Sequence, residues 1–309
     1  MVSGRKLDDR IMKHFENIQS LSEYYGVSLK HPLIDIRKYE DAKREQIIRE
    51  ESIRFGFYTI SFVRNFNGFI QIGNAKFEGG NGVLFFVEPN QLYTCNSTSL
   101  WEGYHVLIHP NIFKEYFLHK GIKAYGFFSY EVNEALVLTE EEREIVQNLL
   151  RLSWDEFHNK RDSFSISIIL SYLSTLLNLA ERFYARQFDN RKSLHNQLLK
   201  AFYELLKTYY LNPMRNEIKQ PSVSYFAKKL NVTPNYLSDT IKHYSGKSAL
   251  QVIQDFVIEE AKERLLSSTQ TISEISFNLG FEYPNYFSRL FKRKTKMSPS
   301  EYRKSVKSI

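Results

Sequence analysis

The sequence has little of several residue types that mark specialised proteins. Cys95 is the single cysteine among 309 residues, so an internal disulfide and a CxxC zinc or redox site are both excluded. The 13 glycines and 8 prolines are too few for a collagen-like or low-complexity chain. The remaining composition, with 42% hydrophobic and 25% charged residues, is ordinary for a globular protein. The length favours two domains rather than one.

Long apolar runs are missing too. The first residues, MVSGRKLDDRIMKHF, contain no apolar core of a secretory signal. The longest uncharged stretch, residues 163–180, falls short of the roughly 20 apolar residues that span a bilayer. Its apolar residues recur at helical spacing. We therefore expect a soluble amphipathic helix there, no membrane segment, and a cytoplasmic protein.

The net charge of +7 is distributed unevenly. Residues 191–309 carry 20 Lys and Arg against 10 Asp and Glu, a net charge of +10. Residues 1–190 carry 22 against 25, a net charge of −3. A basic C-terminal half joined to a mildly acidic N-terminal half indicates a polyanionic partner for the C-terminal half alone.

The N-terminal half changes character along its length. Residues 8–25 predict a helix, because apolar side chains recur on one face up to Gly26. Residues 52–109 hold short aromatic and β-branched runs separated by turn residues. Such a series of short strands predicts a small antiparallel barrel or sandwich. With the helices that follow, the fold class is α+β and multidomain.

Helical periodicity returns at Thr139, which can form a capping box with Glu142 and open a helix to about His158. A second amphipathic helix follows and runs to about Phe188. The two helices of residues 139–188 form either a dimerisation surface or a cover for the strand-rich part. The predicted domains are thus 1–138, the helical region 139–188, a polar linker at 189–193, and an all-helical domain at 194–309.

The basic half contains an internal repeat. The run Pro-Asn-Tyr-Leu-Ser at 234–238 recurs as Pro-Asn-Tyr-Phe-Ser at 284–288, and Ile-Lys at 241–242 recurs as Phe-Lys at 291–292. Both pairs have the same offset of 50 residues. A repeat of this kind indicates that one supersecondary unit is used twice.

Each copy predicts a helix–turn–helix unit, at about 222–245 and 271–295. Asn231 and Gly280 suit the turns, because both residue types tolerate a left-handed backbone. Pro234 and Pro284 suit the first position of the second helix. In the second copy we expect Tyr286, together with Phe287, Leu290 and Phe291, to face inward. Residues 248–266 predict one continuous helix between the units. Its length of roughly 28 Å suits two recognition helices in successive major grooves, about 34 Å apart.

These residues resemble the AraC/XylS family of bacterial transcription regulators. The resemblance covers residues 198–305 and is most specific at Ile272-x-Glu274-Ile275, Gly280-Phe281, residues 285–289, Phe291-Lys292 and Ser298-Pro299-x-x-Tyr302-Arg303. Three residues depart from the family pattern: Ser276 and Lys296, where Ala and Gly are usual, and Tyr283, which replaces a small capping residue. The resemblance implies a cupin-like N-terminal effector barrel with flanking dimerisation helices. It also implies an effector-responsive activator that acts on promoter DNA with RNA polymerase, as a homodimer.

The solvent faces of the two second helices supply candidate DNA contacts. Asn pairs with adenine and Arg with guanine, each worth about 1–3 kcal/mol of discrimination, and a carboxylate can accept from cytosine. The candidate base-reading residues are Asn235, Ser238, Asp239, Asn285, Ser288 and Arg289. The candidate phosphate-binding residues are Lys242, Lys292, Arg293, Lys294 and Lys296. The alternative for each is an ordinary solvated helix face, and cations are favoured at a helix C-terminus in any case.

The strand-rich region supplies candidate effector contacts, because aromatic residues with few polar groups are typical of small-molecule sites. The candidates are Tyr58, Tyr93, Trp101, Tyr104 and His105. The alternative is that each of them simply fills the core.

Two rival functions stay open. A metal-dependent cupin enzyme would need a cluster of histidines and carboxylates, but residues 52–109 contain only His105 and His109. The chain also lacks the GxSxG, Walker and HExxH motifs, so we expect neither catalysis nor a bound cofactor or metal. The other rival is an architectural protein that binds DNA without reading its sequence.

Overall fold

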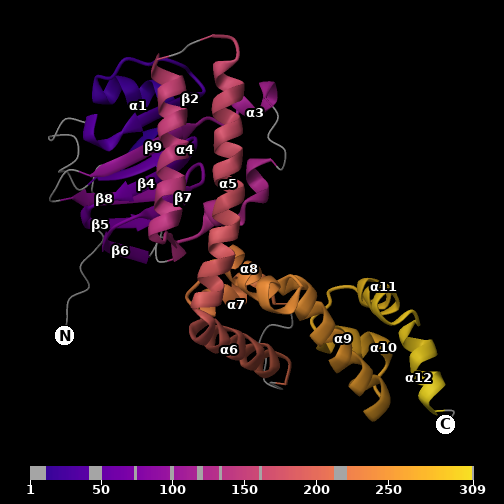
Figure 1. The fold of residues 1–309 in the computed structure, drawn as a ribbon. Coiled ribbons are helices and arrows are strands. Elements are labelled where there is room, and N and C mark those ends of the chain that lie inside the picture. Colours follow the sequence, from indigo (N-terminus) through magenta and orange to yellow (C-terminus); the bar gives the residue numbers. More distant parts are fainter. Residues whose placement is uncertain are drawn as a thin grey trace, which may run out of the picture. The chain divides into compact units, whose positions relative to one another are not determined.

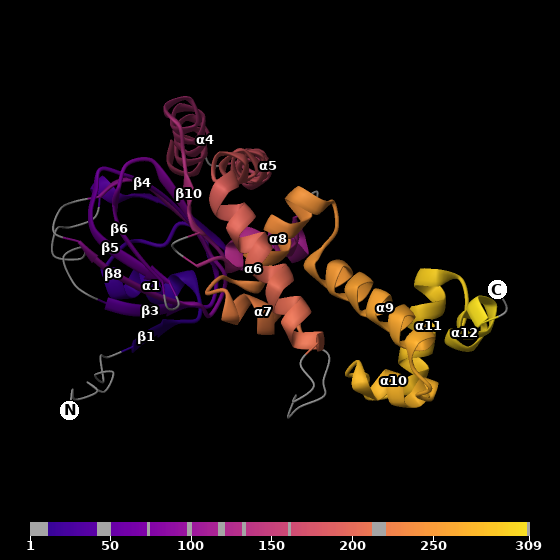
Figure 2. The same cartoon turned by 90° about the horizontal axis from the view of Figure 1, so that it is seen from below.

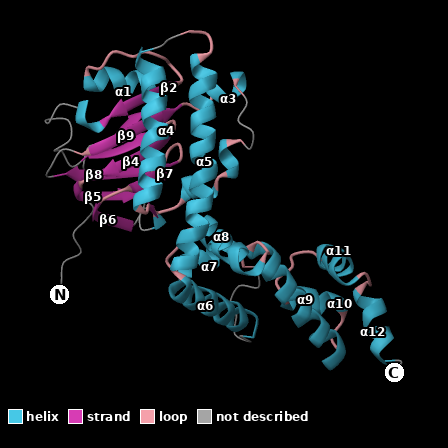
Figure 3. Cartoon of the chain, in the orientation of Figure 1, coloured by secondary structure: helices cyan, strands magenta, loops and turns pink. Residues whose placement is uncertain are grey.

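The chain divides into two compact units in a computed structural model (Figure 1). The structure describes residues 12–41, 51–72, 75–97, 101–116, 121–131, 134–159, 162–211 and 221–307. The N-terminal unit comprises residues 1–190 and the C-terminal unit residues 191–309. Strands occur in the N-terminal unit, whereas the described part of the C-terminal unit is entirely helical (Figure 3). No helix in the described ranges is both long enough and apolar enough to cross a membrane.

The strands of the N-terminal unit form two open five-stranded sheets. The first has the order β1-β3-β8-β5-β6 and the second β10-β7-β4-β9-β2. The strands are β1 (Met12–Phe15), β2 (Ile34–Lys38), β3 (Glu51–Phe55), β4 (Tyr58–Arg64), β5 (Phe66–Ile72), β6 (Ala75–Gly80), β7 (Val83–Val87), β8 (Leu92–Ser97), β9 (Glu102–Ile108) and β10 (Leu136–Val137). The strand-rich prediction for residues 52–109 is therefore confirmed, but the described strands do not close into a barrel.

One face of the second sheet packs against the first sheet, and the alternation of side chains along the strands shows which residues lie on that face. Val63 of β4 and Phe85 of β7 share an apolar cluster with Ile70 and Ile72 of β5. Leu107 of β9 lies in a second cluster with Phe55 of β3. Because side chains alternate with period two, Tyr58, Ile60 and Phe62 of β4 lie on the opposite face.

Two long helices, α4 (Glu140–Asn159) and α5 (Ser165–Asn190), pack against each other in this unit. The predicted capping box at the start of α4 is confirmed, since the Thr139 N–H donates to Glu142 and the Glu142 N–H donates to Thr139 Oγ1. The same Glu142 carboxylate pairs with Arg186 of α5 at 2.8 Å. Gln187 accepts a hydrogen bond from the Val137 N–H, which fastens α5 to β10.

The helix predicted over residues 8–25 is only half right. Residues 1–11 lie outside the described ranges, residues 12–15 form β1, and α1 covers Ile18–Tyr25. The helix begins late because Asn17 caps it, accepting from the Ser20 N–H at 2.9 Å. The preceding residues instead pair with β3 in parallel, and this long-range pairing is invisible to local periodicity. The remaining short helices are η1 (Tyr39–Asp41), α3 (Ile112–Glu115), η2 (Ile122–Ala124) and η3 (Gly126–Ser129).

Seven helices make up the described part of the C-terminal unit. They are α6 (Lys192–Leu211), α7 (Val223–Lys229), α8 (Pro234–Ser245), α9 (Ala249–Ser267), α10 (Ile272–Asn278), α11 (Pro284–Thr295) and α12 (Pro299–Lys307). One apolar core joins them, with Phe226 and Leu237 from the first helix pair and Ile275 and Phe287 from the second packing with α9. Figure 2 shows α8 towards one end of α9, and α10, α11 and α12 towards the other.

The sequence repeat extends to individual hydrogen bonds. At the end of α8, Ser245 Oγ donates to the Ile241 carbonyl and accepts from the Lys247 N–H. At the end of α11, Thr295 Oγ1 makes the same two bonds, with Phe291 and Met297. Ser248 then caps α9 and Ser298 accepts from the Glu301 N–H at the start of α12. The duplicated segment therefore includes the start of the helix that follows each second helix.

Candidate nucleic-acid interface

The second helix of each unit, α8 or α11, is the candidate recognition helix. Pro234 and Pro284 occupy the first turn of these helices, as predicted. Asn231 (φ 55°) and Gly280 (φ 88°) provide the left-handed turn residues, also as predicted. In each unit a left-handed residue thus precedes a second helix that begins with proline, although the turn is one residue longer in the second unit.

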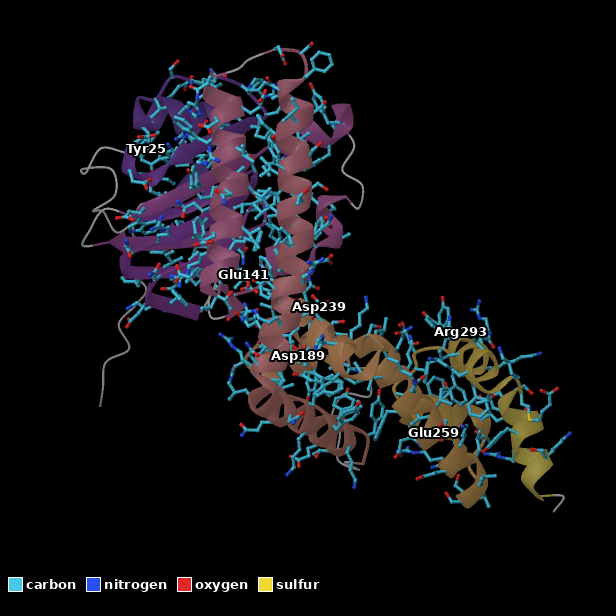
Figure 4. The ribbon with its side chains drawn as sticks, in the orientation of Figure 1. Tyr25, Glu141, Asp189, Asp239, Glu259 and Arg293 are labelled. Atoms are coloured by element: carbon cyan, nitrogen blue, oxygen red, sulfur yellow. The ribbon has the colours of Figure 1, made fainter. Side chains whose placement is uncertain are left out.

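The inward faces of the two recognition helices are apolar and their outward faces carry the predicted polar residues. Leu237 and Ile241 of α8, and Phe287 and Phe291 of α11, are buried. On the other face Asn235, Lys242, Asn285, Arg289, Lys292, Arg293 and Lys296 are exposed, while Ser238, Asp239 and Ser288 are partly exposed. Figure 4 labels Asp239 on α8 and Arg293 on α11.

The expectation that Tyr286 faces inward is wrong. Its side chain is 57% exposed, whereas Tyr236, its counterpart in the repeat, is 6% exposed. Tyr236 is covered because its hydroxyl bonds to buried His195 of α6 at 2.9 Å. The ring of Tyr286 instead lies beneath the Arg289 guanidinium, with 4.9 Å from Cζ to the ring centroid. This cation–π contact orients the arginine on the outward face of α11.

Two equivalent positions on the recognition helices differ in chemistry. Asp239 of α8 corresponds to Arg289 of α11, so the helices present opposite charges one turn from their N-termini. Ser238 Oγ accepts a hydrogen bond from the Ala249 N–H at 3.4 Å, which turns this hydroxyl towards α9. The counterpart of Ala249 is Pro299, which has no N–H to offer Ser288. The first unit therefore has fewer outward-facing polar groups than the second.

Four of the five predicted phosphate-binding cations gather at the end of α11, and the fifth, Lys242, lies in the last turn of α8. Lys292, Arg293 and Lys294 lie in its last turn, where they also complement the helix dipole. Lys296 ends the helix in a left-handed conformation with φ 67°. Lys294 differs from the others because its Nζ is 2.6 Å from Asp255 Oδ1 of α9.

The structure separates the predicted effector residues into two groups. Tyr104 pairs with Phe62 in the sheet and His105 with Ser61, so these neighbours point to opposite faces. Tyr58 lies with Tyr104, and its ring meets Phe128 at 5.1 Å. Trp101 and Tyr93 pack in the cluster between the sheets. His105 also points between the sheets, stacked on Tyr39 at 5.6 Å.

Ionisable groups near these residues have shifted pKa values. Burial, together with the positive charge of Arg37, lowers the pKa of His105 to about 3. Burial first, and then the negative charge of Glu40, raises the pKa of Tyr104. Both side chains are therefore neutral at pH 7. Within the described ranges, no three His, Cys, Asp or Glu side chains are placed to hold a metal ion together.

Comparison with known proteins places the C-terminal unit in a family. A family model described as a helix-turn-helix domain matches residues 226–305. RafR, the raffinose operon transcriptional regulatory protein of Pediococcus pentosaceus, is 26% identical over 183 residues, covering 46% of this chain and 66% of that protein. The arabinose operon regulatory protein of Escherichia coli is 29% identical over 124 residues, covering 36% of this chain and 42% of that protein. The C-terminal unit is an AraC-type helix-turn-helix domain.

The chain also matches part of a much longer protein. Histidine kinase P4 of Formosa agariphila is 32% identical over 110 residues, which are 36% of this chain and 8% of that protein. The chain thus spans less than two thirds of the length of each of these three relatives.

Several residues of the AraC-type domain were not singled out by the sequence. Asp255 lies on α9 in no motif, and nothing in the sequence separates it from other helix-face carboxylates. His195 precedes the repeat, so its partnership with Tyr236 depends on the tertiary packing of α6. Tyr286, at the equivalent position of the second unit, contacts Tyr283 and Arg289 instead and is exposed. These contacts between distant segments carry no local sequence signal.

Proposed function

We propose that this protein is a sequence-specific regulator of transcription that binds double-stranded promoter DNA through two recognition helices. The observation that carries the proposal is the duplicated helix pair of the AraC-type domain, with matching turns and matching ends, on one connecting helix. The surrounding residues 191–309 have a net charge of +10, which suits a polyanion. Insertion of α8 and α11 into successive major grooves would let one chain contact two half-sites.

The outward residues then divide into two roles. Asn235, Asp239, Asn285 and Arg289 are suited to base edges, with Ser238 and Ser288 beside them. Arg289 is the strongest base-reading candidate, because an arginine held by a neighbouring ring is well placed to donate twice to guanine. Lys242, Lys292, Arg293 and Lys296 are suited to phosphates, and so is Lys294 where a phosphate displaces its partner Asp255. Such contacts fix the position of the protein without reading sequence.

The experiment compares two substitutions on a duplex selected by the wild-type protein from a random library. Arg289→Ala should reduce affinity for the selected duplex by about 10–100-fold and affinity for random duplex far less. Lys292→Ala should weaken binding to both duplexes alike. It should also reduce the slope of log affinity against log salt by about 0.9, the value for one phosphate contact. Lys200→Ala, at an exposed lysine of α6, is the charge-matched control and should change neither the affinity for the selected duplex nor that for the random duplex. Equal losses on both duplexes for Arg289→Ala would favour an architectural DNA-binding protein instead.

We further propose that the two-sheet N-terminal unit is a cupin-like effector sensor and that α4 and α5 support a homodimer. The groups between the sheets, including Tyr93, Trp101 and His105, supply the polar tips of an aromatic site, while Tyr58 and Tyr104 face the other side. Effector binding would shift the population of arrangements that activate transcription with RNA polymerase in the cytoplasm.

Ligand screening of the full chain tests this part separately. Both tryptophans, Trp101 and Trp154, lie in the N-terminal unit, so their fluorescence follows its unfolding alone. A binding effector should raise the melting temperature of that transition. Sugars come first in the screen because RafR is named for a raffinose operon, followed by bile acids and aromatic metabolites. No shift with any sugar would exclude that class.

A further inference from the structure

One carboxylate links the ends of both recognition helices. Asp255 Oδ2 lies 2.7 Å from Lys247 Nζ, and Asp255 Oδ1 lies 2.6 Å from Lys294 Nζ. Lys247 follows α8 directly after its C-cap Gly246, and Lys294 lies in the last turn of α11. Asp255 itself belongs to the connecting helix α9. Three elements of the AraC-type domain therefore meet at a single anion.

The geometry of this bridge resembles the way lysines bind a phosphate group. Each carboxylate oxygen receives one ammonium group, and the Asp255 and Lys294 side chains are only 32% and 27% exposed. Burial alone would raise the pKa of Asp255, but the hydrogen bonds from Lys247 and Lys294 outweigh it and hold the pKa below the ordinary range. The carboxylate is therefore charged at neutral pH and competes for these cations with any other anion.

The bridge from Asp255 to Lys247 and Lys294 is not part of the sequence repeat. Met297 stands at the position in the second unit that corresponds to Lys247, and Ser305 at the position that corresponds to Asp255. A helix–turn–helix unit of this chain can therefore be built without these charges. Among the residues that the structure describes, the bridge occurs at the junction of the two units, where both recognition helices end close to α9.

We propose that Asp255 is a positioning residue that holds Lys247 and Lys294 away from DNA phosphates and so lowers sequence-independent binding. The inference rests on the proposed function, since it concerns DNA binding by the same domain. Each lysine that contacts a phosphate adds about 0.9 to the slope of log affinity against log salt. A lysine already paired with Asp255 contributes less, because the phosphate must displace the carboxylate. With fewer phosphate contacts, a larger share of the affinity comes from the base-reading residues. The protein then discriminates more strongly between DNA sequences.

The test measures affinity for a random-sequence 30-bp duplex between about 50 and 200 mM salt. Asp255→Asn keeps the shape of the side chain but removes its charge. It should bind the random duplex several-fold more tightly than wild type, with a salt slope steeper by up to about 1.8. The ratio of affinities for selected and random duplex should fall. Asp255→Glu should restore the wild-type slope, which a purely structural role would not require.

A matched control uses another carboxylate of the same helix. Glu259 of α9 pairs with Lys262 at 2.8 Å and also loses one negative charge in Glu259→Gln. That variant should change the slope much less, because Lys262 lies outside the recognition helices. Equal changes in both variants would show a general charge effect and overturn the proposal. An unchanged slope in Asp255→Asn would overturn it too.

Lysine substitutions test the role of Asp255 independently if the Asp255→Asn variant does not fold. In the wild-type background, Lys247→Ala and Lys294→Ala should each flatten the slope by much less than Lys292→Ala. Slope losses as large as that of Lys292→Ala would contradict the proposal. A wild-type protein without preference for any duplex would refute the proposed function, whereas the random-duplex slopes would still test the role of Asp255.

Discussion

Gly246 and Lys296 occupy the same position in the two halves of the AraC-type domain. Each ends a recognition helix in the left-handed conformation, with φ 71° for Gly246 and φ 67° for Lys296. Each donates its backbone N–H to a lysine carbonyl four residues earlier, that of Lys242 or Lys292. Glycine adopts this conformation without steric conflict, but a lysine there is strained. The backbone of the second unit therefore keeps the form of the first at an energetic cost.

Replacing this lysine should stabilise the C-terminal unit. Lys296→Gly removes the steric strain, although glycine also gains freedom in the unfolded chain, so the net gain should be about 0.5–1 kcal/mol. Gly246→Ala is the reverse experiment. It should lower stability by a similar amount, because it places a side chain on a left-handed backbone. No further loss is expected, since the added Cβ meets no atom within 4 Å. Far-UV circular dichroism during urea unfolding measures both changes. A destabilised Lys296→Gly protein would contradict this account.

The start of α11 lacks a helix cap. Thr233 caps α8 by accepting from the Tyr236 N–H at 3.2 Å, whereas the Tyr283 side chain makes no such bond. The backbone of Tyr283 is already extended, with φ −129° and ψ 122°, as a capping residue requires. Tyr283→Thr should therefore stabilise the domain by about 0.5–1 kcal/mol. Thr233→Ala should cost about 1 kcal/mol in the same unfolding assay, and a stability loss in Tyr283→Thr would refute the prediction.

A buried hydroxyl marks the close approach of α10 to its neighbours. Ser276 is fully buried, and its Oγ has no hydrogen-bond partner in the part of the chain that the structure describes. Ala227 is its counterpart in α7 and is equally buried. Ser276→Ala should stabilise the domain by about 1 kcal/mol, since it removes an unpaired polar group. Ala227→Ser should destabilise it similarly. Opposite signs for the two substitutions, measured by thermal melting, are the decisive result.

The sequence was sufficient for features that depend on neighbouring residues. The turn residues Asn231 and Gly280 and the capping box of Thr139 were all predicted, because each depends on a few residues and on a backbone preference. The C-terminal helices were predictable for the same reason, with the repeat adding a second copy of every signal. Strand content between residues 52 and 109 followed from alternation and composition.

Features that depend on contacts between distant segments were not predictable. β1 was mistaken for helix because its parallel partner lies beyond residue 50. Tyr236 and Tyr286 occupy equivalent positions in the repeat, each after Pro-Asn, yet only Tyr236 is buried, where α6 brings His195 to it. The bridge at Asp255 joins residues 39 positions apart. Similar local sequences therefore have different environments where a distant segment packs against one of them and not the other.

We expect the stability of the N-terminal unit to depend on pH through His105. Burial, and then the charge of Arg37, lowers the pKa of His105 to about 3. In the unfolded chain an ordinary histidine titrates near 6.5, so the unfolded state binds one more proton between these two pH values. Stability from this group is therefore complete above about pH 6.5 and is lost as the pH falls towards 3. At pH 5 the loss relative to pH 7.5 should be at most about 2 kcal/mol.

Tryptophan fluorescence during urea unfolding isolates this effect, because both tryptophans report on the N-terminal unit. His105→Gln should make the free energy of unfolding less dependent on pH between 7.5 and 5, whatever its effect at pH 7.5. His243→Gln, at an exposed histidine of the C-terminal unit, should leave the pH profile of this transition unchanged. Parallel profiles for wild type and His105→Gln would mean that the imidazole between the sheets gains its proton, and its charge, over the same pH range as in the unfolded chain. The charge of Arg37 beside it disfavours that state.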